Sequence, residues 1–302
     1  MHRSIMINQN KKTYFKERIS SKKYGVLMKK IIIVAIFCFF IISKFTPIHG
    51  QQEKIPVLMY HHLENNLNSN VVISPESFED QIRTLKEEGY NSISSQQLYD
   101  FLNYNIKLPE NPVLITFDDG YLSNYELAYP ILKKYGMHAE IFVITSQILE
   151  KNEKTSYLNE IPKMNWDQLR AMQDFITIQS HTWDSHYKLV SNNGVKNAAL
   201  YGPGYINNNF EEQLQYEERV KNDLILSRKL IKEKLGYEPI AISYPFGIKS
   251  EDTIELSKVA GFKMGYVIEN KKIIKGDNLF SLSRITVNGN ETGDELIKKL
   301  KS

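Results

Sequence analysis

The sequence predicts an α/β fold in which short parallel strands alternate with helices and form an open sheet or a barrel. From about Lys54 onward, short apolar runs alternate with stretches of helical periodicity, a pattern that favours parallel strands covered by helices. The chain has 302 residues, of which 42% are hydrophobic, so it is also long enough to bury a sizeable core.

The individual elements follow from apolar runs and from helix start and stop signals. Ser74 before Pro75 is a typical N-cap with proline in the first turn, and Gly89 is a typical stop, so a helix is expected up to Glu88. The same reasoning predicts strands at Ile55–Tyr60, Tyr90–Ser94, Pro112–Phe117, Ala139–Thr145, Phe175–Gln179, Ile240–Tyr244, Gly265–Ile268 and Phe280–Val287. It predicts further helices at Gln96–Asn103, Asn124–Tyr135, Asp167–Gln173, Glu211–Leu235, Glu251–Val259 and Asp294–Leu300.

Lys188–Phe210 interrupts this alternation, because it is polar and rich in Asn and Gly. Long segments of this kind inside a compact domain are usually functional or disordered. We expect a long loop at the rim of the site, with plain disorder as the alternative.

The first 53 residues differ in charge from the rest. They hold ten Lys and Arg and two acidic residues; subtracting these from the totals of 38 and 35 leaves 28 basic and 33 acidic residues, a net charge of −5. The domain beyond residue 53 is therefore mildly acidic, which does not indicate a nucleic-acid partner.

Twelve apolar residues, Ile31–Ile42, follow the basic pair Lys29 and Lys30. The run is shorter than the about 20 residues that a membrane-spanning helix needs and is typical of a signal peptide. We therefore expect residues 1–50 to form a basic head with a signal peptide, or alternatively a retained anchor, and residues 54–302 to form one domain. Whether translation starts at Met1 or Met28 stays open.

The expected protein is secreted or attached to the cell surface, is a monomer, and touches a membrane only through the N-terminal segment. Its one cysteine, Cys38, lies within the apolar run. The domain consequently has no disulfide and no thiol nucleophile, which is no contradiction for a large secreted domain.

The most informative signal for function is the adjacent pair Asp118 and Asp119, which follows the predicted strand that ends at Phe117. Successive side chains on a strand face opposite sides, so one acid can bind a metal while the other accepts a proton. Gly120 allows a sharp turn directly after them. Asp-Asp-Gly is also an ordinary turn sequence, so this segment alone leaves both interpretations open.

His181 and His186 follow the predicted strand Phe175–Gln179 and are five residues apart. That spacing separates the two rings by about 140° on a helix and places them on opposite faces of a strand. They can therefore bind one ion only if the backbone curls after His181. Together with Asp119 they suit a catalytic divalent metal, with zinc expected and cobalt, nickel or iron as alternatives. Two surface histidines in a polar loop are the competing interpretation.

Two other predicted strands end in groups suited to catalysis. His61 and His62 follow Tyr60, and strand alternation directs only one ring toward the site, where imidazole can transfer a proton near neutral pH. Phe246 lies in a predicted Pro-Phe-Gly turn, whose freed backbone N–H groups suit an oxyanion hole. Taken alone, each feature is more often structural.

In this order, the segments Thr116–Gly120, Ser180–His186 and Tyr244–Gly247 resemble the motifs of the NodB-homology polysaccharide deacetylases, carbohydrate esterase family 4. The resemblance covers residues 54–302 and implies an incomplete (β/α)7 barrel that hydrolyses N-acetyl groups on an aminosugar polymer. It also implies that Asp118 is the catalytic base and that Asp119, His181 and His186 bind the metal.

Two departures from the family pattern concern this site. Most relatives space the two histidines four apart, and they carry an arginine that orients the base where this chain has Ser243. Arg284, in the last predicted strand, is the candidate substitute. The C-terminal third also lacks the acid histidine of many relatives. The chain resembles the biofilm poly-N-acetylglucosamine deacetylases in its missing acid histidine, its five-residue histidine spacing, the long polar segment after it and the early segment Pro56–His61. This resemblance implies that His61 is the acid.

The expected reaction is the metal-dependent removal of N-acetyl groups from N-acetylglucosamine units of poly-N-acetylglucosamine or peptidoglycan, with chitin oligomers also open. The N–H of Phe246 is the expected oxyanion donor, and Trp183 and Tyr244 are expected to touch the substrate. One alternative is a catalytically impaired, cell-surface carbohydrate-binding protein on the same fold. Another is a phosphatase with an aspartyl nucleophile, but that class has two aspartates separated by one residue.

Overall fold

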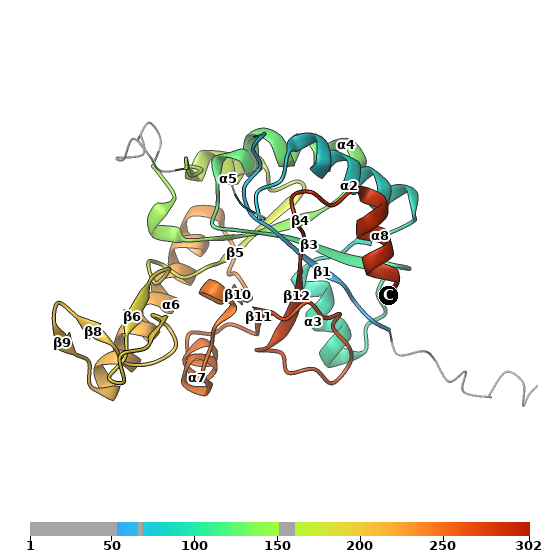
Figure 1. The fold of residues 1–302 in the computed structure, drawn as a ribbon. Helices are drawn as coiled ribbons and strands as arrows, with labels where there is room; N and C mark the ends of the chain where they lie inside the picture. Colours follow the sequence, from blue (N-terminus) through green and yellow to red (C-terminus); the bar gives the residue numbers. More distant parts are fainter. Residues whose placement is uncertain (1–52, 66–68, 70, 151–160) are drawn as a thin grey trace, which may run out of the picture. The chain divides into compact units, whose positions relative to one another are not determined.

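The computed structural model describes residues 53–65, 69, 71–150 and 161–302, so the predicted signal peptide or anchor lies outside the described residues. Seven parallel strands form a ring in the order β1-β12-β11-β10-β5-β4-β3, which a pairing of β3 with β1 closes (Figure 1). These strands are β1 (Val57–Tyr60), β3 (Pro112–Asp118), β4 (Ala139–Val143), β5 (Ile176–Ser180), β10 (Ala241–Ser243), β11 (Met264–Ile268) and β12 (Leu282–Thr286). The predicted α/β barrel is confirmed. A short strand β2 (Asn91–Ser92) pairs with the start of β3.

Helices surround this ring, with α2, α4 and α8 next to one another on one side and α6 and α7 on another (Figure 1). They are α2 (Pro75–Glu87), α3 (Ser95–Tyr104), α4 (Tyr129–Tyr135), α5 (Trp166–Ala171), α6 (Gln213–Leu235), α7 (Glu251–Val259) and α8 (Gly293–Lys301), with short 3₁₀ turns at Thr145–Gln147 and Pro245–Gly247. As predicted, Ser74 caps α2 by accepting a hydrogen bond from the backbone N–H of Ser77. None of the described helices combines the length and the apolarity that crossing a bilayer requires.

The predicted helix Asn124–Tyr135 begins with a π-helical turn, Asn124–Ala128, before α4. Pro130 explains the change, because proline has no backbone N–H and cannot continue the regular hydrogen-bond ladder. The N–H of Tyr129 bonds instead to the carbonyl of Asn124, five residues earlier.

The expectation of an irregular loop at residues 188–210 is wrong. The segment forms two small antiparallel hairpins, β6 (Lys188–Val190) with β7 (Lys196–Ala198) and β8 (Tyr205–Ile206) with β9 (Asn209–Phe210). Asn207 and Asn208 connect the second hairpin with φ angles of 49° and 65°. Positive φ at both central residues is typical of a type I′ turn, which favours asparagine, so the consecutive asparagines were a hairpin signal.

Strand β3 shows how the barrel separates its two faces. Val113, Ile115 and Phe117 belong to the core cluster beneath α2, α4 and α8. Leu114 belongs instead to the cluster inside the ring, and alternation places Thr116 and Asp118 on that inner face as well. The barrel thus directs the last residue of β3 inward.

Candidate active site

Asp118 and Asp119 lie at the carboxyl end of β3 in different surroundings. Asp118 is 2% exposed and faces the barrel interior, whereas Asp119 follows the strand with a φ of 73°, a left-handed conformation that aspartate tolerates better than most residues. Gly120 also has a positive φ, and a Cβ there would lie 3.1 Å from both Val143 and Ile148. The turn therefore needs glycine for its backbone and for its lack of a side chain.

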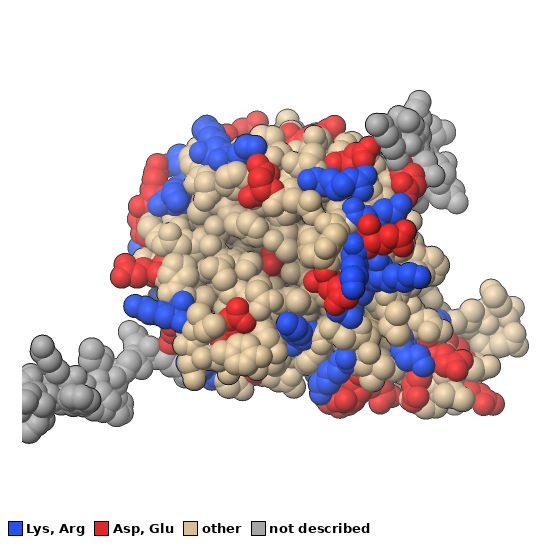
Figure 2. Space-filling view, turned by 180° about the vertical axis from the view of Figure 1, so that it is seen from behind, with Lys and Arg blue, Asp and Glu red and all other residues tan. Residues whose placement is uncertain are grey.

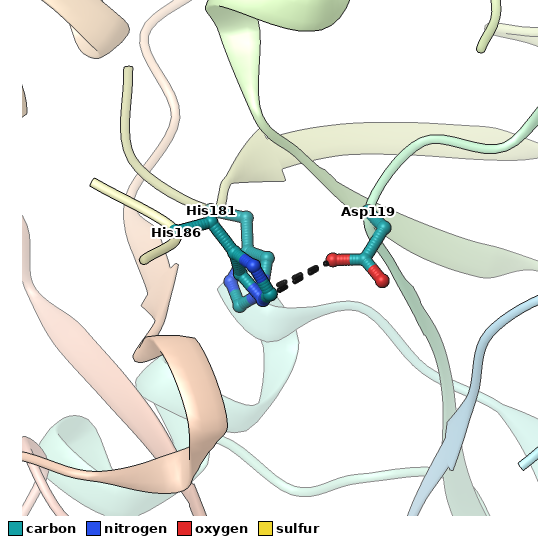
Figure 3. A group of neighbouring side chains, drawn as sticks. All are labelled: Asp119, His181 and His186. Atoms are coloured by element: carbon teal, nitrogen blue, oxygen red, sulfur yellow. Dashed lines mark ion pairs between the residues drawn. The ribbon is translucent and has the colours of Figure 1, made fainter. Parts of the chain in front are cut away.

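Asp119, His181 and His186 come together from β3 and the loop after β5. The Nε2 atoms of both histidines lie 3.5 Å from Oδ1 of Asp119, and Figure 3 shows the two rings facing this carboxylate. The three ligand atoms lie within 4.8 Å of one another. Oδ1 of Asp119 is buried without a hydrogen-bond partner in the described residues, which is costly for a carboxylate unless a cation satisfies it. These residues therefore fit zinc or a related divalent ion.

A second hydrogen bond fixes the His181 ring. Its Nδ1 lies 2.7 Å from the backbone carbonyl of Ser243, and because a carbonyl only accepts, Nδ1 carries the proton and Nε2 keeps its lone pair. Burial lowers the pKa of His181 to about 4, against the opposing effect of the two aspartates. The ring is therefore neutral near pH 7 and is ready to act as a ligand.

Arg284 from β12 binds Asp118 with both ends of its guanidinium group. Nη1 donates to Oδ1 and Nη2 donates to Oδ2, each over 2.7 Å. Nη2 also donates to the hydroxyl of Ser243, which in turn donates to Asp118. Ser243, where the resemblance led us to expect an arginine, thus joins Arg284, which reaches Asp118 from another strand.

The charge of Asp118 is set by two opposing effects. Burial would raise the pKa of this carboxyl, but the guanidinium of Arg284, with smaller contributions from His181 and His61, holds it well below its usual range. Burial also opposes ionisation of Asp119, and His181, Lys163 and His61 together lower its pKa. Both carboxylates are consequently charged at neutral pH.

The two early histidines differ in their contacts. Half-buried His61 acts electrostatically on both aspartates, and its Nδ1 is buried with no hydrogen-bond partner in the described part of the chain. His62 instead hydrogen-bonds through Nδ1 to the hydroxyl of Ser123 over 2.8 Å and lies 3.6 Å from Glu64. The structure thus places His61 beside the carboxylates and engages His62 elsewhere.

The three aromatic candidates have different positions. The ring of Phe246 lies 4.7 Å from that of His186, centroid to centroid, which brings the Pro-Phe-Gly turn next to the candidate metal ligands. Trp183 is 37% exposed and lines a hollow of 340 Å³ beside α6. Tyr244 has no exposed surface and packs among core residues of α6 and α7, so the expectation that it touches substrate is wrong.

The sequence reasoning missed two buried acids near the site. Asp223 on α6 accepts hydrogen bonds from the loop between the two metal-site histidines, and Glu140 on β4 lies inside the barrel against Ser95. One acidic residue in a long helix carries no signal of such a contact. Glu140 interrupts an apolar strand, which does indicate a special environment.

Charge on the surface is mixed. On the face shown in Figure 2, Lys and Arg alternate with Asp and Glu around a central area of mostly uncharged residues, within which some acidic atoms are visible. That face carries no continuous basic patch of the kind that binds nucleic acid. The absence of a nucleic-acid partner stays a prediction.

Comparisons with known proteins agree with this geometry. The chain is 31% identical over 241 residues to the Bacillus subtilis protein YxkH, covering 80% of this chain and 74% of that protein. It is 29% identical to a poly-beta-1,6-N-acetyl-D-glucosamine N-deacetylase of Staphylococcus aureus, covering 76% of this chain and 72% of that enzyme. The solved structure of a de-N-acetylase from Aggregatibacter actinomycetemcomitans superposes with a TM-score of 0.72 at 28% identity, over 82% of this chain and all of that one. Residues 105–265 match the sequence model described as polysaccharide deacetylase, and the chain therefore belongs to the polysaccharide deacetylase family.

Proposed function

We propose that this protein removes N-acetyl groups from N-acetylglucosamine units of an extracellular polysaccharide in a metal-dependent hydrolysis. The observation that carries the proposal is the position of the Asp118–Arg284 pair next to the set of Asp119, His181 and His186. A buried carboxylate that stays charged at neutral pH, beside three candidate metal ligands, suits amide hydrolysis.

Asp119, His181 and His186 are the residues that would hold the ion. When bound, a divalent ion supplies Lewis acidity toward an acetamide carbonyl and lowers the pKa of water from about 15.7 to about 7. Zinc is the ion we expect, because two imidazoles and one carboxylate leave a catalytic zinc site with open positions.

Asp118 accepts a proton from the attacking water. Oδ2 accepts from both Arg284 and Ser243, whereas Oδ1 accepts from Arg284 alone. Each carboxylate oxygen has two lone-pair sites, so one on Oδ1 remains for the water. Arg284 keeps the base ionised and fixes its direction, although it also makes the base weaker. A weak base suffices where the water is itself acidified.

His61 and the Phe246 turn complete the reaction. His61 in its protonated form donates to the nitrogen of the departing aminosugar, and the N–H of Phe246 donates to the oxyanion. Acetate leaves and the polymer gains a free amine, which is cationic at neutral pH. Each turnover therefore makes the polysaccharide more basic.

We favour poly-N-acetylglucosamine over peptidoglycan as the substrate, because the named relative from Staphylococcus aureus acts on the former. Trp183 is the proposed stacking surface for a sugar ring, since it is partly exposed and adjoins a hollow. Secretion, with attachment only through the N-terminal segment, would bring a monomeric enzyme to such a polymer.

The alternative of glycan binding without hydrolysis rests on Ser243, which stands where relatives carry the orienting arginine. Arg284 makes this alternative weaker, because it supplies a guanidinium group to the Asp118 carboxylate. A phosphatase is disfavoured for the same geometric reason, since the Asp118 carboxylate is held by Arg284 on both oxygens.

The test is acetate release from poly-N-acetylglucosamine, peptidoglycan and chitin oligomers after chelation, with zinc, cobalt, nickel or iron added back. We expect activity to vanish with chelator and to return with metal. Asp118→Asn should abolish acetate release while keeping metal binding, and Asp119→Asn should abolish both. Parental activity of Asp118→Asn would exclude this residue as the base.

The adjacent residues His61 and His62 allow a matched test of which residue acts as the general acid. His61→Gln should lower kcat by about 10²–10⁴-fold, the usual contribution of a general acid, whereas His62→Gln should retain activity. Equal losses in the two variants would exclude His61 from its proposed role. Binding of glycan with no acetate released under any metal would favour the carbohydrate-binding alternative.

A further inference from the structure

His186 reaches the metal set only because the chain between the two histidines forms a tight loop. Thr182, the first residue of this loop, has a φ of 78°, in the left-handed region that a β-branched side chain strongly disfavours. A conformation of this kind persists only where surrounding contacts impose it. The loop must therefore be held from outside.

Helix α6 provides that hold. Asp223 is 6% exposed, and its two oxygens accept from the backbone N–H of Trp183 over 2.9 Å and of Asp184 over 2.8 Å. The hydroxyl of Ser185 donates to the same carboxylate over 2.9 Å. One side chain of α6 thus binds three consecutive loop residues.

The remaining polar groups of the loop are also bound. The N–H of Thr182 bonds to the hydroxyl of Ser180, and that hydroxyl bonds to Ser227, one turn after Asp223 on α6. The N–H of Ser185 bonds to the side chain of Thr182. Every backbone N–H between the two histidines therefore has an acceptor, and two of the four depend on Asp223.

Asp223 makes these contacts without a compensating cation. In the described ranges, no Lys or Arg forms an ion pair with it, and burial raises its pKa despite the hydrogen bonds from the loop. A buried, unpaired carboxylate is costly. Asparagine would avoid that cost but has one acceptor oxygen, so it cannot serve both amide groups on separate oxygens.

We propose that Asp223 is a positioning residue of the metal site, which fixes the loop of residues 182–185 so that His186 presents Nε2 to the ion. The inference rests on the proposed metal-dependent function. On this proposal, the two histidines are aligned by helix α6 behind the loop and not by their spacing in the sequence. Removing this hold should weaken metal binding even though Asp223 touches no ligand atom.

The test is titration of chelator-treated protein with cobalt(II), followed by its visible d–d absorption and without any substrate. Asp223→Asn should bind cobalt about 10- to 100-fold more weakly than the parent, the usual effect of losing an outer partner of a metal ligand, with an altered spectrum. Asp184→Asn is the matched control. In the part of the chain that the structure describes, the side chain of this exposed neighbour bonds only to Ser146, so the variant should keep parental affinity.

The outcomes separate the two proposals. If the parent binds no cobalt, the metal site and the role of Asp223 both fall. If the parent and Asp223→Asn bind cobalt with equal affinity and the same spectrum, only the role of Asp223 falls. Should Asp223→Asn not fold, Ser185→Ala removes one of the three donors and should weaken binding several-fold, and parental affinity there would overturn the proposal.

Discussion

Replacing Arg284 with methionine should destabilise the protein mainly through the carboxylate that it leaves behind. Asp118 is 2% exposed and would lose two charge-assisted hydrogen bonds of 2.7 Å. Methionine preserves much of the apolar packing of the arginine stem. Removing one member of a buried ion pair costs about 3–5 kcal/mol, and we expect the free energy of unfolding at pH 7 to fall by that amount.

The loss should depend on pH, and the structure sets its sign. In the parent, Arg284 overcomes burial and holds the pKa of Asp118 well below its usual range, so the stabilising contribution of the pair persists until the pH is very low. In the variant, burial raises the pKa of the lone carboxyl, which then takes up a proton as the pH falls and relieves the penalty. The difference in the free energy of unfolding between parent and variant should therefore be smaller at pH 5 than at pH 7.

Urea unfolding of the metal-free proteins at both pH values measures this effect. Adding Asp118→Asn to Arg284→Met removes the buried charge and should recover at least about 1 kcal/mol at pH 7. Arg83→Met is the matched control, since Arg83 is partly exposed and its ion pairs with Asp80 and Glu87 lie at the surface, so this substitution should cost far less stability. A loss under about 1 kcal/mol in Arg284→Met, or no recovery in the double variant, would refute the reasoning.

Two further substitutions probe the interior. Burial raises the pKa of Glu140 to about 7 against its hydrogen bonds from Ser95, so the parent loses stability as the pH rises from about 4.5 to about 7. Glu140→Gln should therefore gain about 3 kcal/mol relative to the parent between pH 4.5 and pH 8; parallel urea-stability curves would contradict this. Gly265→Ala would place a Cβ 2.5 Å from the buried hydroxyl of Tyr244 and should cost about 1–3 kcal/mol. The control Gly202→Ala, in open space, should leave the melting temperature unchanged.

The positions of Asp118, Asp119 and His181 could be predicted because they depend on local patterns. Each follows an apolar run, and the carboxyl ends of parallel strands in a barrel meet at one face. The pairing of Asp118 with Arg284 was harder to predict from the sequence, since the two residues lie 166 positions apart. Arg284 was a candidate because Ser243 stands where an arginine was expected and because Arg284 lies in the last predicted strand.

The wrong prediction for Tyr244 has a simple cause. Ser243 directs its hydroxyl to Asp118 inside the barrel, so alternation sends the next side chain outward beneath the helices. That argument was available in the sequence once Ser243 was assigned to the site. The contact of Asp223 with Trp183 could not be predicted from the sequence in this way. It joins residues 40 apart and depends on how a helix packs on a loop.

The placement of Arg284 on β12 has a consequence for how the protein is made. This strand lies between β11 and β1, so the ring closes only when Leu282–Thr286 is in place. During synthesis, Asp118 leaves the ribosome long before the arginine that neutralises it, and contacts of such sequence separation form late and slowly. A chain that ends before β12 would lack both the closing strand and the positive charge that pairs with Asp118. Under the proposed function, the protein would therefore become active only late in its assembly, and a chain that ends before β12 would be inactive.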